Sequence, residues 1–283
     1  MYASGANESG QLGLGIKGSS INKFNLAPSV TVKQVACGWA HSILLTVDGR
    51  VLVSGDNKKG QLGLGAEITD LSTFKPLESI NEPVKQVACG VWSSFAVLKS
   101  GRVLFWGQFR NIKKDVCWIP TEIEEMNNVS KISIGHKHIL SLSDTGNISG
   151  FGCNKYGQID FQFENVLDIY AGWNHSVIKL DTNTLLLLGK NDHNQLAHHD
   201  KSIKRNLLRF DDEIIKDISV GSDHCLVLTD KRLLVWGWNE HGIIGKNHIN
   251  QSFGPPDELQ FDISGITRIF CGPVSNFIVT KQK

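Results

Sequence analysis

Ten histidines and six cysteines are the side chains in this sequence that could bind a metal ion or carry out nucleophilic chemistry. Three cysteines stand directly before a glycine, and none lies in a Cys-x-x-Cys pair: Cys37, Cys89 and Cys271. Four histidines each stand three residues after one of the glycines Gly38, Gly135, Gly172 and Gly221: His41, His138, His175 and His224. Positions that recur along a chain are spread over separate structural units. We therefore expect buried structural cysteines, histidines that each brace a unit by a hydrogen bond, and no metal site.

A glycine-rich string near the N-terminus matches a nucleotide-binding motif. Residues Gly13–Gly18 have the Gly-x-Gly-x-x-Gly spacing that holds a pyrophosphate. That motif binds phosphate only where it joins a strand to a helix, and here the turn-rich Ser19–Asn22 follows it. The sequence also has no Gly-Lys-Ser/Thr phosphate loop and no Gly-x-Ser-x-Gly nucleophile elbow. We expect neither an enzyme nor a cofactor, and assign these glycines to positive backbone angles.

Internal repeats explain the spacing of these residues and indicate the architecture. The string Gly10–Gly15 returns letter for letter as Gly60–Gly65. Six further glycines, the marker glycines, are spaced 52, 45, 37, 49 and 51 residues apart. They are Gly38, Gly90, Gly135, Gly172, Gly221 and Gly272. Each marks one unit of a sixfold repeat.

Each unit contains an apolar run, a turn and a second apolar run, which is typical of a β-hairpin. In the first unit the turn is Asp48-Gly49. No segment keeps a helical period, so we predict an all-β fold: a single six-bladed β-propeller over residues 1–283, with seven blades as the less favoured count. Strand Tyr2–Gly5 has no preceding partner and strand Phe277–Thr280 has no following one. Pairing of these N- and C-terminal strands would close the ring.

Charge and hydropathy exclude several classes of partner. The 29 basic and 28 acidic residues give a net charge of +1, so no overall field attracts nucleic acid or an anionic membrane. The longest purely aliphatic stretch, Leu185–Leu188, is far shorter than the roughly 20 apolar residues that span a bilayer. The N-terminus has neither a basic region nor an apolar core, which favours a cytoplasmic and nuclear protein.

The two residues between each marker glycine and the histidine position are expected to form a turn at one rim of the ring. These rim turns carry tryptophan in three of the six units. Exposed aromatic residues with polar neighbours are typical of a protein-binding surface, although each indole could instead fold back over its own unit. The partner-binding candidates in these turns are Trp39, Trp92, His136, Lys137, Trp173, Asn174 and Asp223.

A second candidate contact is the loop after the last complete hairpin. Its residues are Trp238, Asn239, Glu240 and His241. We expect its polar residues to stay exposed while Trp236 packs inside. A purely structural loop is the alternative.

The repeated motif resembles the regulator of chromosome condensation repeat: Val-Ala-Cys-Gly, then His-Ser, an Asp-Gly turn and Gly-Gln-Leu-Gly-Leu-Gly. The resemblance covers the whole chain and is most specific in the first two units. The founding member of that family is a seven-bladed propeller and an exchange factor for the GTPase Ran, and its rim faces the GTPase. The resemblance implies guanine-nucleotide exchange, with Asp223 displacing magnesium and phosphate contacts. This sequence departs from the founding member in its six units and in having no obvious extra hairpin to serve as a wedge.

Within the family, the string Trp236–Gly242 resembles the fungal alpha-tubulin suppressor, or killer-toxin-insensitivity, branch. A similar string occurs in a secretion-regulating exchange-factor homologue. The fungal branch partners a small zinc-ribbon electron carrier and supports diphthamide synthesis and, through Elongator, wobble-uridine modification of tRNA. The leading hypothesis is therefore a non-enzymatic propeller that binds such a carrier, and the alternative is an exchange factor or regulator of a small GTPase. Chromatin attachment is disfavoured because the chain has no basic tail.

Overall fold

The computed structural model describes residues 1–27, 30–245, 251–273 and 275–281, with His241 described by its backbone alone. The chain divides into two compact units, Met1–Ile132 (unit 1) and Ser133–Lys283 (unit 2). Within the described residues the only helical element is the one-turn 3-10 helix η1 (Glu240–Gly242). The prediction of an all-β chain is confirmed. No helix in the described part of the chain is long and apolar enough to cross a membrane.

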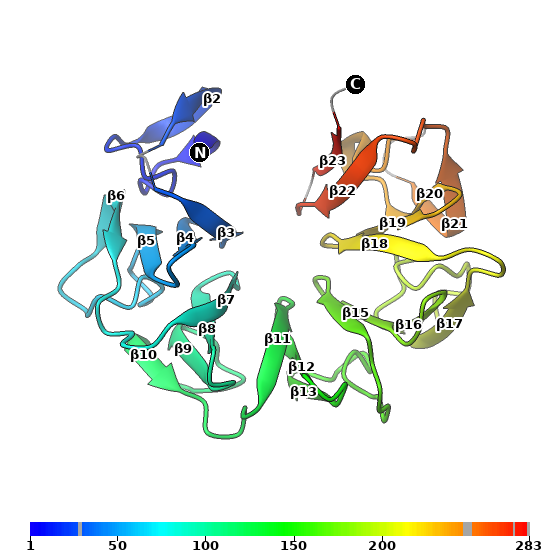
Figure 1. Cartoon of the computed structure of the whole chain (residues 1–283), viewed down its shortest axis with the longest axis horizontal. Helices are drawn as coiled ribbons and strands as arrows, with labels where there is room; N and C mark the ends of the chain where they lie inside the picture. Colours follow the sequence, from blue (N-terminus) through cyan, green and yellow to red (C-terminus); the bar gives the residue numbers. More distant parts are fainter. Residues whose placement is uncertain (28–29, 246–250, 274, 282–283) are drawn as a thin grey trace. The chain divides into compact units, whose positions relative to one another are not determined.

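Unit 1 contains a two-stranded sheet followed by two four-stranded sheets (Figure 1). The first sheet pairs β1 (Tyr2–Asn7) with β2 (Gly18–Leu26). The next sheet contains β3 (Val32–Cys37), β4 (His41–Thr46), β5 (Val51–Asp56) and β6 (Asp70–Pro76). The third contains β7 (Val84–Cys89), β8 (Ser93–Leu98), β9 (Val103–Gly107) and β10 (Cys117–Glu122). The middle strands are buried nearly throughout because neighbouring sheets cover their faces, and they read as continuous apolar runs.

Strand β11 (Val129–Ile134) spans the boundary between the units and heads a three-stranded sheet. That sheet continues in unit 2 with β12 (His138–Ser143) and β13 (Ile148–Gly152). A four-stranded sheet follows, with β14 (Asp168–Ala171), β15 (His175–Lys179), β16 (Thr184–Gly189) and β17 (Arg205–Arg209). The next contains β18 (Ile215–Val220), β19 (His224–Thr229), β20 (Leu233–Trp238) and β21 (Ser252–Leu259). A two-stranded sheet of β22 (Ile266–Cys271) and β23 (Asn276–Thr280) comes last.

The sheet of β11, β12 and β13 has three strands, whereas the sheets on either side of it have four. Its marker glycine is only 37 residues from the next one, the shortest spacing in the chain. After β13 the chain therefore has no room for a regular outer strand, and it crosses to β14 as an irregular segment. Ile159, Phe161 and Phe163 of that segment are partly buried against the core between this sheet and the next.

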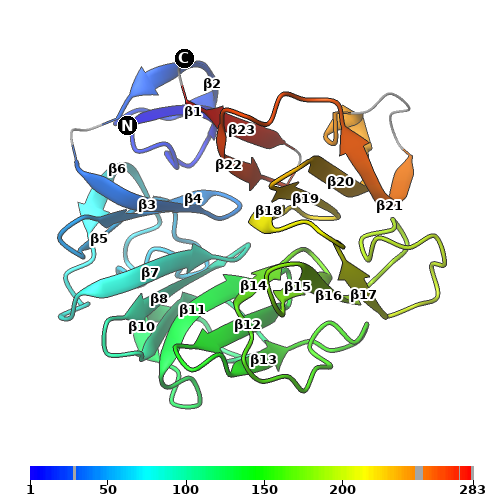
Figure 2. The same ribbon diagram turned by 45° about the vertical axis from the view of Figure 1, so that its right-hand side comes forward.

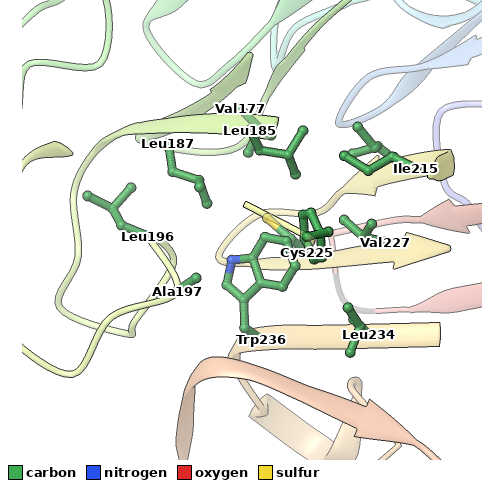
Figure 3. Close-up of a cluster of buried hydrophobic side chains, with 12 residues drawn as sticks. Val177, Leu185, Leu187, Leu196, Ala197, Ile215, Cys225, Val227, Leu234 and Trp236 are labelled. Carbon is green, nitrogen blue, oxygen red and sulfur yellow. The ribbon is translucent and has the colours of Figure 1, made fainter. Parts of the chain in front are cut away.

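Neighbouring sheets within a unit are held together by apolar side chains from facing strands. Figure 2 shows the sheet of β3–β6 beside that of β7–β10 in unit 1. In unit 2, Trp236 lies fully buried in a cluster formed by the sheets of β14–β17 and β18–β21 (Figure 3). Its Nε1 donates a hydrogen bond of 2.9 Å to the carbonyl of Gln195. Trp106 makes the same 2.9 Å bond to Gln61 in unit 1, so the packing of Trp236 is confirmed as part of the repeat.

Two of the three glycines of the nucleotide-motif look-alike, Gly13 and Gly15, have the expected positive φ, whereas Gly18 does not. Gly13 and Gly63, at the same place in the two copies, have φ of 66° and 69°. Only glycine adopts that region readily. Gly18, the last glycine of the match, opens strand β2 and not a helix. The string therefore lacks the helix N-terminus that a pyrophosphate needs.

Candidate functional site

The four repeated histidines are structural, as predicted. Each imidazole is at most 1% exposed. Each joins its own sheet to the next through Nε2: His41 to Ser94 Oγ at 3.0 Å, His138 to Ser176 Oγ at 3.0 Å, His175 to Cys225 Sγ at 3.5 Å, and His224 to Asn276 Oδ1 at 2.8 Å. In every case the partner lies one residue after the histidine position of the following unit. Each imidazole is thus buried and bonded through Nε2 to the following sheet, which is a bracing role, while its Nδ1 is buried without a hydrogen-bond partner.

Two glutamines that sequence reasoning overlooked also join the first strands of adjacent sheets. The amide of Gln34 on β3 donates to the Val87 carbonyl at 2.9 Å and accepts the Val87 N–H at 3.0 Å. Gln86 on β7 does the same with Ile132, at 2.9 and 2.8 Å. Their identical place in the strings Gln-Val-Ala-Cys-Gly is the sequence signal that could have revealed this role. These clamps fix the strands that lead into the rim turns.

In unit 1 the rim turns leave their indoles in solvent. Trp39 is 75% exposed and Trp92 is 48% exposed. The Trp39 N–H donates to the Val91 carbonyl at 3.3 Å, so the two turns are joined by their backbones while the side chains stay free of the core. The alternative that these indoles fold back over their own units does not hold for Trp39. An exposed indole offers a large apolar surface and one N–H donor to a partner.

In unit 2 the equivalent turns pack more closely. The rings of His136 and Trp173 stack, with centroids 4.3 Å apart and planes 10° from parallel. The backbones of these turns are also joined. The backbone N–H of His136 donates to the Trp173 carbonyl at 3.0 Å, and the backbone N–H of Trp173 donates to the Ser222 carbonyl at 2.8 Å. Partial burial, with the charge of Lys137 beside it, lowers the pKa of His136. Trp173 is half-buried, and part of its surface remains available.

The polar members of the unit 2 turns differ in freedom. Lys137 is exposed, whereas Asn174 and Asp223 are half-buried. The Asp223 Oδ1 accepts a hydrogen bond of 2.7 Å from Gln195 Nε2, which orients the carboxylate. Gln195 in turn is fully buried in the loop before β17. A carboxylate fixed at a rim turn is suited to contact a cationic or hydrogen-bond-donating partner group.

The second candidate contact must be corrected at Asn239. We expected its side chain to be exposed, but Asn239 is fully buried. Its Oδ1 accepts the Ile244 N–H at 3.1 Å, and its own N–H donates to the Gln251 carbonyl at 2.9 Å. Asn57 and Asn191 hold their loops in the same way, each accepting an N–H five residues ahead at 2.8 Å. Asn239 is therefore a loop organiser.

The neighbours of Asn239 retain part of the candidate contact. Trp238 is half-buried and packs against the His193 ring, with centroids 4.5 Å apart. Glu240 is half-buried. The side chain of His241 lies outside the described residues.

The cysteine prediction is partly wrong. Cys37 is exposed, and Cys89 and Cys271 are half-buried. They end the first strands of their sheets, where the burial of side chains alternates along β3. Cys225, on a middle strand, is buried, and burial raises the pKa of its thiol. No group of three or more His, Cys, Asp or Glu side chains suited to a metal ion occurs among the described residues.

These repeated antiparallel sheets and clamped turns define the chain as an all-β repeat protein. The sequence profile of the RCC1-like domain family matches residues 1–283, and the chain belongs to that family. A curated relative, the secretion-regulating guanine nucleotide exchange factor of Mus musculus, is 28% identical over 87% of this chain. The ultraviolet-B receptor UVR8 of Arabidopsis thaliana is 28% identical over 76% of it. The chain covers 64% of the length of the first relative and 53% of the second.

Solved structures show the same fold. Human WBSCR16 superposes with a TM-score of 0.85 at 20% identity, covering 99% of this chain and 82% of that one. Prp20p of Saccharomyces cerevisiae gives a TM-score of 0.82 at 20% identity, covering 99% of this chain and 78% of that one. That structure was described together with the binding of Prp20p to Gsp1p and histones.

Trp39 and Trp173 pack differently, so we expect their removal to change the free energy of unfolding by different amounts. Trp39→Ala is expected to change the free energy of unfolding by no more than about 0.5 kcal/mol, because the indole is mostly in solvent. Trp173→Ala is expected to cost about 1 kcal/mol, because it removes the stacking with His136. Urea unfolding of both variants checks this. A large loss for Trp39→Ala would mean that its indole belongs to the core.

Proposed function

We propose that the chain is a non-enzymatic binding protein that regulates a small GTPase through its rim turns. The observation that carries the proposal is the exposure of Trp39 and Trp92 on turns whose backbones are hydrogen-bonded together. Rigid, exposed aromatic residues are the side chains that most often anchor protein interfaces. The family supports a GTPase as partner, since a relative is named a guanine nucleotide exchange factor.

Asp223 supplies a polar group for the contact that we propose at the rim turns of unit 2. Exchange factors act by weakening the bonds between the GTPase and the phosphates and magnesium of its nucleotide. A carboxylate brought to that site competes with the phosphates for the same cations and N–H donors. Asp223 is suited to this because Gln195 holds it in one orientation on its turn. Trp173, whose turn is hydrogen-bonded to the turn of Asp223 within unit 2, supplies apolar surface, and the carboxylate acts on the nucleotide site.

The zinc-ribbon carrier is the second partner to test. It is supported by the resemblance of the Trp236–Gly242 string, in which the burial of Asn239 removes one expected contact. The Elongator-dependent tRNA modification and diphthamide synthesis implied by that resemblance depend on the carrier. A net charge of +1 favours either protein partner over direct binding of nucleic acid. We place the activity in the cytoplasm and nucleus.

Affinity capture on the native protein followed by mass spectrometry separates the two partners. We expect a small GTPase that is recovered by the wild type and depleted by Trp39→Ala. Recovery of a zinc-ribbon protein and no GTPase would overturn the proposal in favour of the second partner. A variant that removes another exposed apolar side chain away from the rim, such as Ile119→Ala on β10, is the control.

We also propose that the chain forms one domain, a six-bladed propeller whose last blade combines the two terminal sheets. A two-stranded sheet alone is marginally stable. In unit 1 the β1–β2 sheet exposes Tyr2, Phe24 and Leu26 by 66, 72 and 69%. In unit 2 the β22–β23 sheet exposes Phe277 by 60%. Pairing of β23 with β1 would give four strands in the order of the complete sheets and would cover apolar surface at both ends.

Deletion of residues 1–5 tests this closure. We expect the unfolding midpoint to fall sharply, because the deletion removes most of β1 and leaves β23 without its partner. An unchanged midpoint would count against a closed ring.

A disulfide tests the register of the closure directly. In the first complete sheet Ile43 pairs with Val53, and the corresponding terminal residues are Phe277 and Ala3. The double variant Ala3→Cys with Phe277→Cys is expected to oxidise to one intramolecular disulfide, seen by mass spectrometry. Ser4→Cys with Phe277→Cys is the control, because a slip of one residue turns the side chain to the opposite face. Equal cross-linking of both variants would contradict the register.

A further inference from the structure

The outer strand β17 in unit 2 presents an uncovered face. Arg205, Leu207 and Arg209 alternate with half-buried residues along β17, and all three are exposed. They pair with Leu188, Leu186 and Thr184 of β16, respectively. Leu186 and Leu188 belong to the core shared with the preceding sheet. The exposed face of β17 is therefore the side turned toward the three-stranded sheet.

In unit 1 the corresponding outer strands are covered by a loop of the preceding sheet. The Gly15 N–H donates to the Ser72 carbonyl on β6 at 2.7 Å, and the Gly65 N–H donates to the Trp118 carbonyl on β10 at 3.0 Å. Both glycines end a Gly-Gln-Leu-Gly-Leu-Gly string. The copy before β17 degenerates after Gly157-Gln158-Ile159, and its sheet has no fourth strand. Strand β17 thus loses both the loop contact and the neighbouring outer strand.

The result is an open groove of about 610 Å³. Its walls are Phe163 of the irregular segment and the faces of β16 and β17, including Leu186 and Leu207. Leu207 is 47% exposed, which places an apolar side chain in the groove next to solvent. All residues of the groove belong to unit 2, and none belongs to a rim turn.

The charges of the groove are unevenly distributed. The Arg205 guanidinium lies 5.3 Å from the centroid of the Phe163 ring and stacks above it. Arg209 shares the groove with the carboxylates of Asp181 and Asp211. The Asn183 N–H already donates to Asp181 at 2.8 Å, and that bond, with others and with Arg209 nearby, lowers the pKa of the Asp181 carboxyl. The Arg205 end is therefore the part of the groove best suited to an added carboxylate.

We propose that this groove binds an extended segment of a partner protein that carries acidic and apolar residues two positions apart. Alternate residues of an extended segment point to the same side, as do those of β17. An apolar side chain of the segment packs between Leu207 and Phe163, and an acidic one pairs with Arg205. A guanidinium held over an aromatic ring is partly oriented before binding, which reduces the entropy that pairing costs. The groove is independent of the rim turns and serves a second partner contact.

A fluorescein-labelled, end-capped nonapeptide tests this when titrated with the full chain. Glutamate and valine take turns at its odd positions, with serine at the even positions, so that both side chains lie on one face. We expect saturable binding by fluorescence polarisation. Arg205→Glu should weaken it by at least about tenfold, because it places like charges opposite each other. The nonapeptide with lysine in place of glutamate should bind Arg205→Glu better than it binds the wild type. Lys201→Glu, the same change of charge at an exposed residue outside the groove, should leave binding of the glutamate peptide nearly unchanged.

Hydrogen exchange locates the peptide on the chain. We expect its addition to protect amides of residues 203–209 in the wild type and to have no such effect in Arg205→Glu. The proposal is overturned if the glutamate peptide fails to saturate, if Lys201→Glu weakens it as much as Arg205→Glu, or if protection falls elsewhere. Thermal melts that match the wild type establish that both variants are folded.

Discussion

Gly135→Ala is expected to destabilise the protein by about 3 kcal/mol or more, although it adds a single methyl group. A Cβ at Gly135 would lie 2.2 Å from Cε1 of His138 and 2.6 Å from the carbonyl oxygen of Gly172. The first contact would expel a fully buried imidazole, and the second involves backbone of the next sheet, which cannot move aside. Loss of the 3.0 Å bond from His138 to Ser176 would also leave buried polar atoms without a partner.

The backbone angle of Gly135 is not the obstacle, because its φ is not in the left-handed region. The glycine is required because the imidazole three residues later occupies the space of its side chain. The matched control is Gly18→Ala, where a Cβ meets nothing within 4 Å. Urea unfolding of both variants measures the difference. A cost below about 1 kcal/mol for Gly135→Ala would show that the histidine can relocate, and the bracing role would be wrong.

Mild acid is expected to unfold the protein through the same histidines. Burial lowers the pKa of His41, His138 and His175 to about 4 from the ordinary 6.5. The unfolded chain therefore binds protons at these positions below pH 6.5, while the folded chain does not. This part of the stability is fully present above pH 6.5 and is lost as the pH falls toward 4. The slope is about 1.4 kcal/mol per pH unit for each imidazole, so at pH 5 each costs roughly 2 kcal/mol.

Unfolding free energies measured from pH 8 to pH 5 check this expectation. Replacing one of the imidazoles, as in His138→Ser, should lower the slope of unfolding free energy against pH by about 1.4 kcal/mol per pH unit, which corresponds to one proton. The variant is nevertheless less stable than the wild type at pH 7. Serine already stands at this position of the repeat in Ser93 and Ser275. His199→Ser, at an exposed loop residue, is the control and should leave the slope unchanged. A free energy that stays constant from pH 7 to pH 5 would rule out the buried neutral histidines as the cause of acid sensitivity.

Repetition made the framework predictable. His41 and its three equivalents were recognised as braces because one role explained four positions, and the hydrogen bonds of all four have that role. The same reasoning, applied to Asn57, Asn191 and Asn239, would have revealed the buried loop organiser. It was missed because a polar residue after a hairpin was assigned to solvent by its chemical type. The short spacing after Gly135 likewise signalled a unit too short for four strands.

The exposure of the side chains in the rim turns could not be predicted from the repeat. Trp39 and Trp173 occupy the same position of the repeat, yet one indole is 75% exposed and the other stacks on His136. The difference depends on the residue in the neighbouring turn, which varies from unit to unit and carries no repeated signal. Cys37 is exposed for a similar reason, because its burial depends on what lies across from the first strand of its sheet. Local sequence determines the strands and turns, whereas contacts between units of the repeat determine which side chains remain free.

The release of labelled GDP from the GTPase recovered by affinity capture tests the proposed function most directly. We expect wild-type protein to accelerate release, and Trp39→Ala to lose most of that acceleration while its unfolding free energy stays within about 0.5 kcal/mol of the wild type. Release at the spontaneous rate in the presence of saturating wild-type protein, or acceleration unchanged by Trp39→Ala, would contradict a GTPase regulator that acts through the rim turns.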